Sequence, residues 1–74
     1  MPSYKVQCLH RISRTVVWEM LITADNVLHA VAKLILPTVK QMEFIRQYKE
    51  VNNQPLEVDH PTFPGIYLVR AEKI

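Results

Sequence analysis

The sequence predicts an α+β fold, a two-layer sandwich whose three-stranded antiparallel sheet carries helices on one face, in the order β-β-α-α-β. Three observations predict it. Apolar and polar residues alternate over two segments near the N-terminus, apolar residues recur at helical spacing in the middle, and a further alternating segment closes the chain. Seventy-four residues are enough for one domain, so 1–74 is taken as a single unit.

The first two strands are expected at residues 4–12 and 16–23. In the first, Tyr4, Val6, Cys8 and Ile12 fall on one face, which predicts that this face points toward the core. Only three residues separate the two segments, so they should pair as an antiparallel hairpin. A third strand at 66–73 is expected beside the first, which would then lie at the centre of the sheet.

Residues 27–35 carry an amphipathic helical stripe, and Asp25 is expected to cap its first turn because a carboxylate accepts from the free N–H groups there. This helix should end by Leu36, because a residue that precedes proline is pushed out of the α region. Pro37 therefore predicts a joint between two helices rather than a defect within one.

After Pro37, Thr38 and Gln41 have the spacing of a capping box, which predicts that a second helix begins here and runs over 39–51. Residues 52–65 hold three prolines and the chain's one glycine, and predict a long loop with a short extended piece at 56–58. Loops of this length in small domains are often functional.

The charge distribution is uneven. Residues 1–18 carry three basic side chains and no acid, whereas residues 19–74 carry six basic and seven acidic ones, for a net charge of +2. Two of the basic residues, Arg11 and Arg14, would lie on the predicted hairpin. Basic groups on a hairpin can hold phosphates, so a small nucleic-acid-binding protein is one alternative function. Alternatively, these arginines belong to a solvated turn, where their charge protects the sheet edge from aggregation.

The sequence predicts a cytoplasmic protein with no membrane partner. A single cysteine cannot form an internal disulfide, which favours a reducing compartment. The first residues lack the pattern of a signal peptide, and no apolar run approaches the ~20 residues that a membrane-spanning helix needs.

No catalytic residue, metal site, cofactor or small-molecule substrate is predicted, so the chain is not expected to be an enzyme. Cys8 and His10 share a strand face, but a thiol among apolar residues is typical of a core. Asp59, His60 and Phe63 form a candidate loop site, in which the acid could orient the imidazole or could belong to an ordinary turn. The three histidines lack the spacing of a zinc site.

Surplus apolar residues on the sheet predict a small interaction module that binds another protein or forms a homodimer through a sheet face or edge strand. Residues on the face opposite the helices make up the candidate partner surface: Lys5, Leu9, Arg11, Arg14, Val17, Glu19 and Leu21.

The stretch in which a strand passes through Ile22–Asn26 (ITADN) into a helix resembles the outline of small phage or mobile-element accessory proteins. Such proteins often consist of a hairpin, a helix laid over it and a last strand. The resemblance implies a protein that acts on a host factor. It concerns the outline alone and assigns no functional residue.

Overall fold

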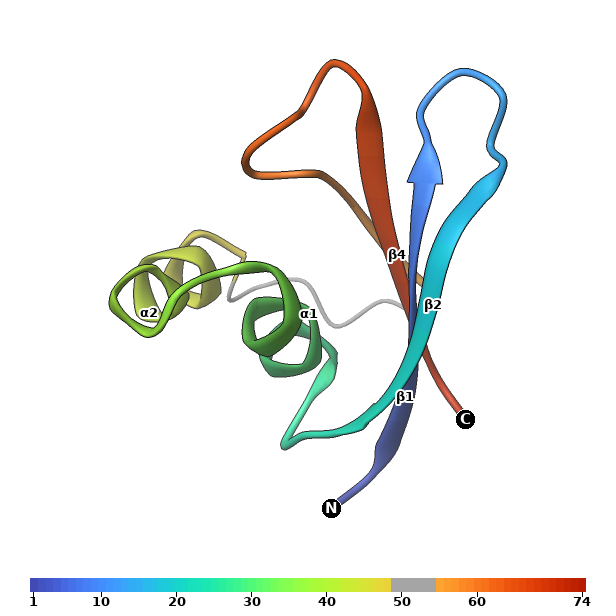
Figure 1. Ribbon diagram of the computed structural model, residues 1–74. Helices are drawn as coiled ribbons and strands as arrows, with labels where there is room; N and C mark the ends of the chain where they lie inside the picture. Colours follow the sequence, from blue (N-terminus) through green and yellow to red (C-terminus); the bar gives the residue numbers. More distant parts are fainter. Residues whose placement is uncertain (49–54) are drawn as a thin grey trace.

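The computed structural model of the chain describes residues 1–48 and 55–74 and confirms an α+β fold with helices on one side of an antiparallel sheet (Figure 1). Its elements in chain order are β1 (Ser3–His10), β2 (Val16–Thr23), α1 (Val27–Ile35), α2 (Thr38–Gln47), β3 (Leu56–Asp59) and β4 (Tyr67–Lys73). The strands lie in the order β2-β1-β4-β3, and every neighbouring pair is antiparallel. The expected central position of β1 is confirmed.

The sheet has four strands, so the prediction of three was wrong. The additional strand, β3, lies within the segment expected to be a long loop, where only a short extended piece was foreseen at 56–58. Leu56 pairs with Ala71 and Val58 with Val69, and both β3 side chains are buried. The four residues of β3 include Glu57 and Asp59 and carry little strand signal of their own, because acidic residues are depleted in strands. Pairing with β4 decides the structure.

The hairpin of β1 and β2 is confirmed, with Tyr4 opposite Ile22 and Cys8 opposite Trp18. The register shifts after Cys8, where Leu9 pairs with Val16, so β2 contains one extra residue at Val17, a β-bulge.

The turn of this hairpin is closed by backbone hydrogen bonds. The N–H of His10 donates to the carbonyl of Thr15 at 2.9 Å, and that of Arg14 donates to the carbonyl of His10 at 2.8 Å. Ile12 lies in this turn and is 94% exposed, so its predicted core position was wrong. The reason is that β1 ends at His10, two residues earlier than expected.

The core lies between the sheet and α1, which packs against β1 and β4. Its centre is formed by side chains with no exposed surface, namely Val6, Val31 and Val69. Cys8 is also buried, as predicted. In Figure 1, α2 lies beside α1 on the side away from the sheet. It contributes one buried side chain, Phe44. This position explains why Val39 is 86% exposed although the sequence placed it on an apolar helical face.

The proline joint is confirmed, because α1 ends at Ile35 with Leu36 as its extended C-cap, and α2 begins immediately after Pro37. The caps differ from the prediction. The N-cap of α1 is Asn26 rather than Asp25, and its side chain accepts from the backbone N–H of His29 at 2.9 Å. The chain enters the helix one residue later than expected, and this places the Asn26 amide at the free N–H groups of the first turn.

The predicted capping box does not form. Pro37 is the N-cap of α2 and Thr38 is already helical, so the Thr38 side chain cannot take the capping position. Gln41 instead donates from Nε2 to the carbonyl of Leu36 at 3.1 Å, which links the start of α2 to the end of α1. The helix ends at Gln47, and residues 49–51 of the predicted helix lie outside the described residues.

Candidate functional site

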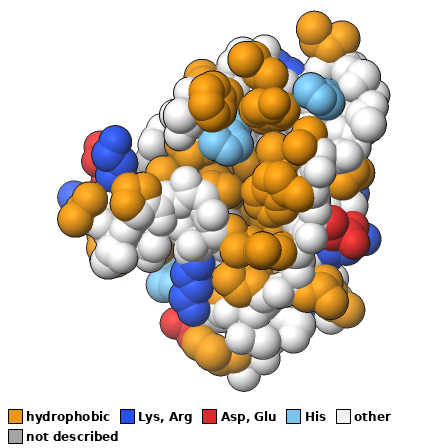
Figure 2. Space-filling view, in the orientation of Figure 1, with side chains coloured by type: hydrophobic (Ala, Val, Ile, Leu, Met, Phe, Trp, Pro, Cys, Tyr) orange, Lys and Arg blue, Asp and Glu red, His pale blue; other side chains and the backbone are white. Residues whose placement is uncertain are grey.

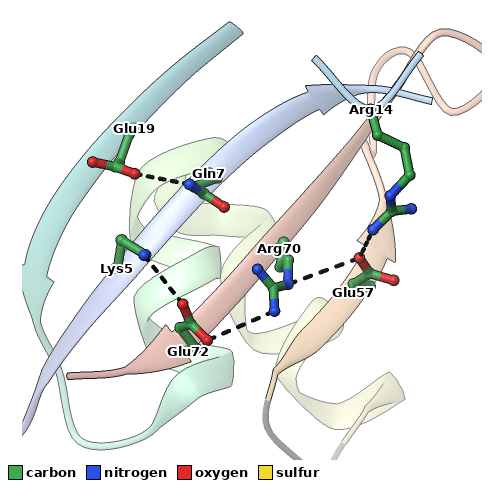
Figure 3. Close-up of polar contacts among 7 residues, drawn as sticks. All are labelled: Lys5, Gln7, Arg14, Glu19, Glu57, Arg70 and Glu72. Atoms are coloured by element: carbon green, nitrogen blue, oxygen red, sulfur yellow. Dashed lines mark hydrogen bonds and ion pairs between the residues drawn. The ribbon is translucent and has the colours of Figure 1, made fainter. Parts of the chain in front are cut away.

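The sheet face that points away from the helices carries a network of charged and polar side chains, which Figure 3 shows. Lys5 Nζ lies 3.2 Å from Glu72 Oε1, and Arg70 lies 3.7 Å from Glu72 Oε2 and 3.9 Å from Glu57 Oε1. On the β2 side, Gln7 donates to Glu19 at 2.8 Å. The network crosses all four strands, so most of this face presents charges that already have partners.

The predicted partner surface lies on or beside this open face, but its members differ in accessibility. Leu9 is only 6% exposed and cannot provide much contact area. Leu21 and Val17 are 68% and 46% exposed, and both belong to β2 at the edge of the sheet. Lys5 and Glu19 are engaged by Glu72 and Gln7. The accessible apolar part of this surface is therefore confined to β2.

The two hairpin arginines, also members of the predicted surface, both contact acids of β3. Arg11 pairs with Asp59 and also donates to the carbonyl of Pro64 at 3.0 Å, and Arg14 pairs with Glu57 (Figure 3 shows the second pair). Arg14 lies in the turn between β1 and β2 and adopts a left-handed backbone conformation with φ of 59°. These contacts neutralise much of the positive charge that the sequence placed on the hairpin.

The candidate loop site is divided by the sheet. Asp59 points to the open face, where it pairs with Arg11, whereas His60 contacts the aromatic rings of Phe63 and Tyr67. Asp59 therefore does not orient His60, although the two are adjacent in the sequence. Of the three predicted members, His60 and Phe63 lie together, with ring centroids 5.7 Å apart.

His60 is held by its own loop. Its Nδ1 accepts from the backbone N–H groups of Thr62 at 3.1 Å and Phe63 at 3.3 Å. Only an unprotonated Nδ1 can accept these bonds. Burial lowers the pKa of His60 below its ordinary value of 6.5, because desolvation disfavours the charged imidazolium. Both effects favour a neutral, partly apolar ring at this position.

A cluster of rings surrounds His60. The ring centroids of His10 and Tyr67 are 5.2 Å apart, and Tyr67 lies 6.1 Å from both His60 and Phe63. His10 and Tyr67 are paired residues of β1 and β4 and therefore share a face of the sheet. This is the face that the helices cover farther along the strands. The cluster joins the strand ends to the loop between β3 and β4.

A hollow of about 430 Å³ lies beside this cluster, lined by Trp18 and Met20 of β2, Leu34 and Ile35 of α1, and His60. Figure 2 shows hydrophobic side chains in a band down the middle of this side of the molecule, with histidine near its upper part and charged groups toward its margins. Together, the lining residues and the ring cluster are called the histidine–aromatic surface, made up of His10, Trp18, Met20, Leu34, Ile35, His60, Phe63 and Tyr67.

The surface stays open because α1 is short. A nine-residue helix is about 13 Å long, whereas the eight-residue strands β1 and β2 extend about 26 Å. One helix of this length covers roughly half of the strands beneath it, and α2 lies beyond α1 instead of covering the rest (Figure 1). Trp18 and Met20 remain accessible on the uncovered half, where Met20 is 52% exposed.

Two further hollows are less suited to an apolar ligand or lie at the periphery. One, of about 480 Å³, lies near β3 and includes Arg11, Glu57 and Asp59, whose charges are engaged in ion pairs. Another, of about 290 Å³, lies between the two loop tips and includes Ile12 and Ile66. The hollow between the loop tips extends the apolar part of the histidine–aromatic surface, because Ile12 and Ile66 line it.

Groups that could support chemistry are scarce in the part of the chain that the structure describes. Burial raises the pKa of the Cys8 thiol, because an apolar setting disfavours the thiolate. Among the described residues, no group of three or more His, Cys, Asp or Glu side chains could hold a metal ion. Likewise, no described helix has the length and apolar character needed to cross a membrane.

The sequence singled out two members of this surface, His60 and Phe63, as a candidate site, but did not place Trp18, His10 or Tyr67 with them. Trp18 is partly buried and packs against the core. The helix and strand lengths were the one available signal, because a short stripe at 27–35 cannot cover eight-residue strands. Which half of the sheet face stays uncovered depends on where α1 lies on the sheet, and a local sequence pattern does not predict that position.

Comparison of the chain with protein-family models, with curated proteins and with solved structures finds no match.

Proposed function

We propose that this protein is a small, non-enzymatic interaction module that binds an apolar segment of another protein at the histidine–aromatic surface. The observation that carries the proposal is the uncovered half of the helix-side sheet face, where Trp18 and Met20 form the floor of a 430 Å³ hollow. Apolar surface left exposed in a domain this small favours association, because burying it gains about 25 cal/mol per Å².

The composition of the surface supports a protein partner. Aromatic side chains and Met are enriched where proteins bind one another, whereas charged groups are depleted at the centre of such sites. Trp18, Phe63 and Tyr67 supply wide, stiff contact areas, and His60 contributes a neutral ring. A partner that inserts an aliphatic or aromatic side chain between α1 and the loop would match this chemistry.

The contacts of the hairpin give the nucleic-acid alternative less support. Arg11 and Arg14, which motivated that alternative, each pair with an acid of β3. Phosphate binding depends on basic side chains that can exchange counterions for phosphates. A phosphate would have to compete with Asp59 and Glu57 for these arginines, so we place the binding site on the other face of the sheet.

We place the protein in the cytoplasm on the basis of its single cysteine, which is buried in β1. The role of a phage or mobile-element accessory protein that acts on a host factor remains a prediction from the outline of the fold. A host protein with an exposed apolar segment would be the corresponding partner.

Site-specific photocrosslinking in the source cells tests the proposal. Phe63 is replaced by a photoreactive phenylalanine analogue, which preserves the aromatic ring at a half-exposed position of the surface. We expect a discrete crosslinked protein. The matched control carries the same analogue at Val39, an 86% exposed position on α2 away from the surface, and should give no such product.

A second pair of variants measures the energy of the contact. Phe63→Ser should weaken binding of the crosslinked partner by about tenfold or more, because aromatic anchors carry a large share of interface energy. Val39→Ser should leave the affinity unchanged. Equal crosslinking from positions 63 and 39, or a partner that binds Phe63→Ser as tightly as wild type, would contradict the proposal.

A further inference from the structure

The two edges of the sheet differ in how they are protected against pairing with another strand. The β3 edge has four residues, and its charged members, Glu57 and Asp59, form ion pairs across the sheet. The β2 edge has eight residues, VVWEMLIT, with one charge. Short, charged edge strands resist pairing, whereas long apolar edges invite it. In the described part of the chain, no strand lies outside β2.

The pairable part of β2 can be delimited. The bulge at Val17 increases the local twist and interrupts the ladder near the hairpin turn. At the other end, the backbone N–H of Ala24 donates to the carbonyl of Pro2, and the Ala24 side chain is fully buried. The regular segment whose outer edge is free to pair is therefore Trp18–Thr23. It presents Met20 and Leu21, which are 52% and 68% exposed on opposite faces of the sheet.

This segment is complementary to itself. A two-fold axis perpendicular to the sheet at Leu21 would place Leu21 opposite Leu21 of a second copy, Met20 opposite Ile22, and Glu19 opposite Thr23. Each pair shares a face, as antiparallel pairing requires. The two Glu19 carboxylates then lie well apart along the strands, whereas an axis at Glu19 would bring them face to face.

We propose that β2 pairs with β2 of a second copy, so that the protein is a symmetric dimer whose two four-stranded sheets join into one of eight strands. Main-chain hydrogen bonds between the two edges set the geometry, and Leu21, Met20 and Ile22 supply the apolar contact. A standard interface covers about 800 Å² per partner. That is roughly one-sixth of the 4861 Å² surface of this chain.

The dimer would have a defined consequence for the surface described above. With the axis perpendicular to the sheet, the helices of both copies lie on the same side. The two Met20 side chains would then be diagonal neighbours across the junction, with each Trp18 farther along its own strand, and the two hollows would form one longer apolar surface. The dimer does not require the proposed partner, because its contacts are the β2 backbone, Leu21 on the open face, and Met20 against Ile22 of the second copy.

Light scattering coupled to size exclusion, from micromolar to millimolar concentration, tests the dimer. We expect the mass of two chains for wild type and a dissociation constant raised about a hundredfold in Leu21→Glu, which replaces a buried leucine in each copy with like charges across the axis. Leu21 is the cross-strand neighbour of Lys5 within one chain, so the new carboxylate suits the folded monomer. Val39→Glu, at an exposed helical position, should dimerise as wild type does.

Charge complementation and crosslinking make the test specific to β2. Mixing Leu21→Glu with Leu21→Lys should restore dimerisation at concentrations at which each variant alone is monomeric. Leu21→Cys should yield a disulfide-linked dimer on mild oxidation, because directly opposed residues in antiparallel strands fall within disulfide range, whereas Val39→Cys should not. A monomeric wild type over the whole concentration range, or a dimer unaffected by Leu21→Glu, would overturn the inference. Neither result would affect photocrosslinking from position 63.

Discussion

His60 shows how a single side chain can organise a loop. It follows the last residue of β3, and its Nδ1 accepts from the N–H groups of Thr62 and Phe63, so the ring substitutes for a backbone acceptor. The same ring contacts Phe63 and Tyr67. Protonation would remove both hydrogen bonds and place a charge among aromatic groups. The loop geometry is therefore coupled to the protonation state of one residue.

This coupling predicts a pH dependence of stability. Above the ordinary pKa of 6.5, His60 is neutral in the folded and unfolded chain alike. As the pH falls below 6.5, the unfolded chain binds a proton that the folded protein takes up only at lower pH, so the free energy of unfolding decreases. Denaturant titrations at several pH values between about 7.5 and 5 measure this loss.

His60→Asn provides the control, because the asparagine Oδ1 can accept the same two backbone hydrogen bonds and does not titrate. We expect the variant to lose less stability than wild type over the same pH interval. The comparison also cancels the effect of pH on the rest of the chain, which is the same in both proteins. Parallel pH profiles for wild type and variant would rule out His60 as the source.

The start of α1 allows a second test at the level of single residues, because two adjacent side chains were candidates for the same cap. Asn26→Ala should lower the free energy of unfolding by about 1 kcal/mol, since it removes the acceptor for the His29 N–H. Asp25→Ala should change it by less than about 0.5 kcal/mol, because Asp25 is exposed and lies 4.0 Å from His29. Thermal or denaturant unfolding of both variants decides between them; equal losses would contradict the assignment.

At the scale of elements, the two edges of the sheet behave as opposites. β3 is short and acidic, and the arginines of the distant hairpin turn reach it, so the ion pairs link the turn to the far edge (Figure 3). β2 is long and almost uncharged. The acids that make β3 hard to recognise in the sequence are the groups that protect it, and the apolar residues that make β2 easy to recognise leave it open to pairing.

The same Val→Ala substitution in the core should lower the free energy of unfolding by different amounts in a strand and in a helix. Val69 of β4 and Val31 of α1 are both fully buried. Val→Ala removes two methyl groups and leaves a small cavity, at a cost of about 2 kcal/mol. In the helix, the better propensity of Ala returns about 0.5 kcal/mol, whereas in the strand the β-branched residue is preferred.

We therefore expect Val69→Ala to destabilise the protein more than Val31→Ala, by about 1 kcal/mol in chemical denaturation. Val39→Ala, at an exposed position of α2, should be neutral or slightly stabilising. If the helical variant proved the more damaging of the two buried ones, the core would be organised around α1 to a greater degree than its packing against β1 and β4 indicates.

The elements that the sequence predicted correctly are those whose side-chain period extends over seven or more residues. β1, β2, β4 and α1 all belong to this group, and the break at Pro37 follows from backbone sterics alone. The prediction failed for β3, where four residues are too few to establish a period, and at the caps. A cap depends on where the chain enters the helix, and one residue of displacement moved this role from Asp25 to Asn26.

At the scale of the whole molecule, the relative lengths of helix and strand decide what is exposed. α1 reaches over about half of the strands, and α2 packs beside it, so the opposite half of the same face keeps its aromatic and apolar groups accessible (Figures 1 and 2). The other face of the sheet is largely occupied by ion pairs. The molecule thus presents one polar face, one apolar hollow and one unprotected edge.

For this protein, the sequence by itself determined the class of fold, the hairpin, the helix break at Pro37 and the burial of Cys8, because each follows from local periodicity or backbone sterics. Only the tertiary structure decided that Leu56–Asp59 joins the sheet, that Arg11 and Arg14 pair with acids of β3, and that Asp59 and His60 lie on opposite faces. The two ion pairs join residues 48 and 43 positions apart, and β3 is placed by pairing with a strand on the other side of a loop, so a local pattern encodes neither.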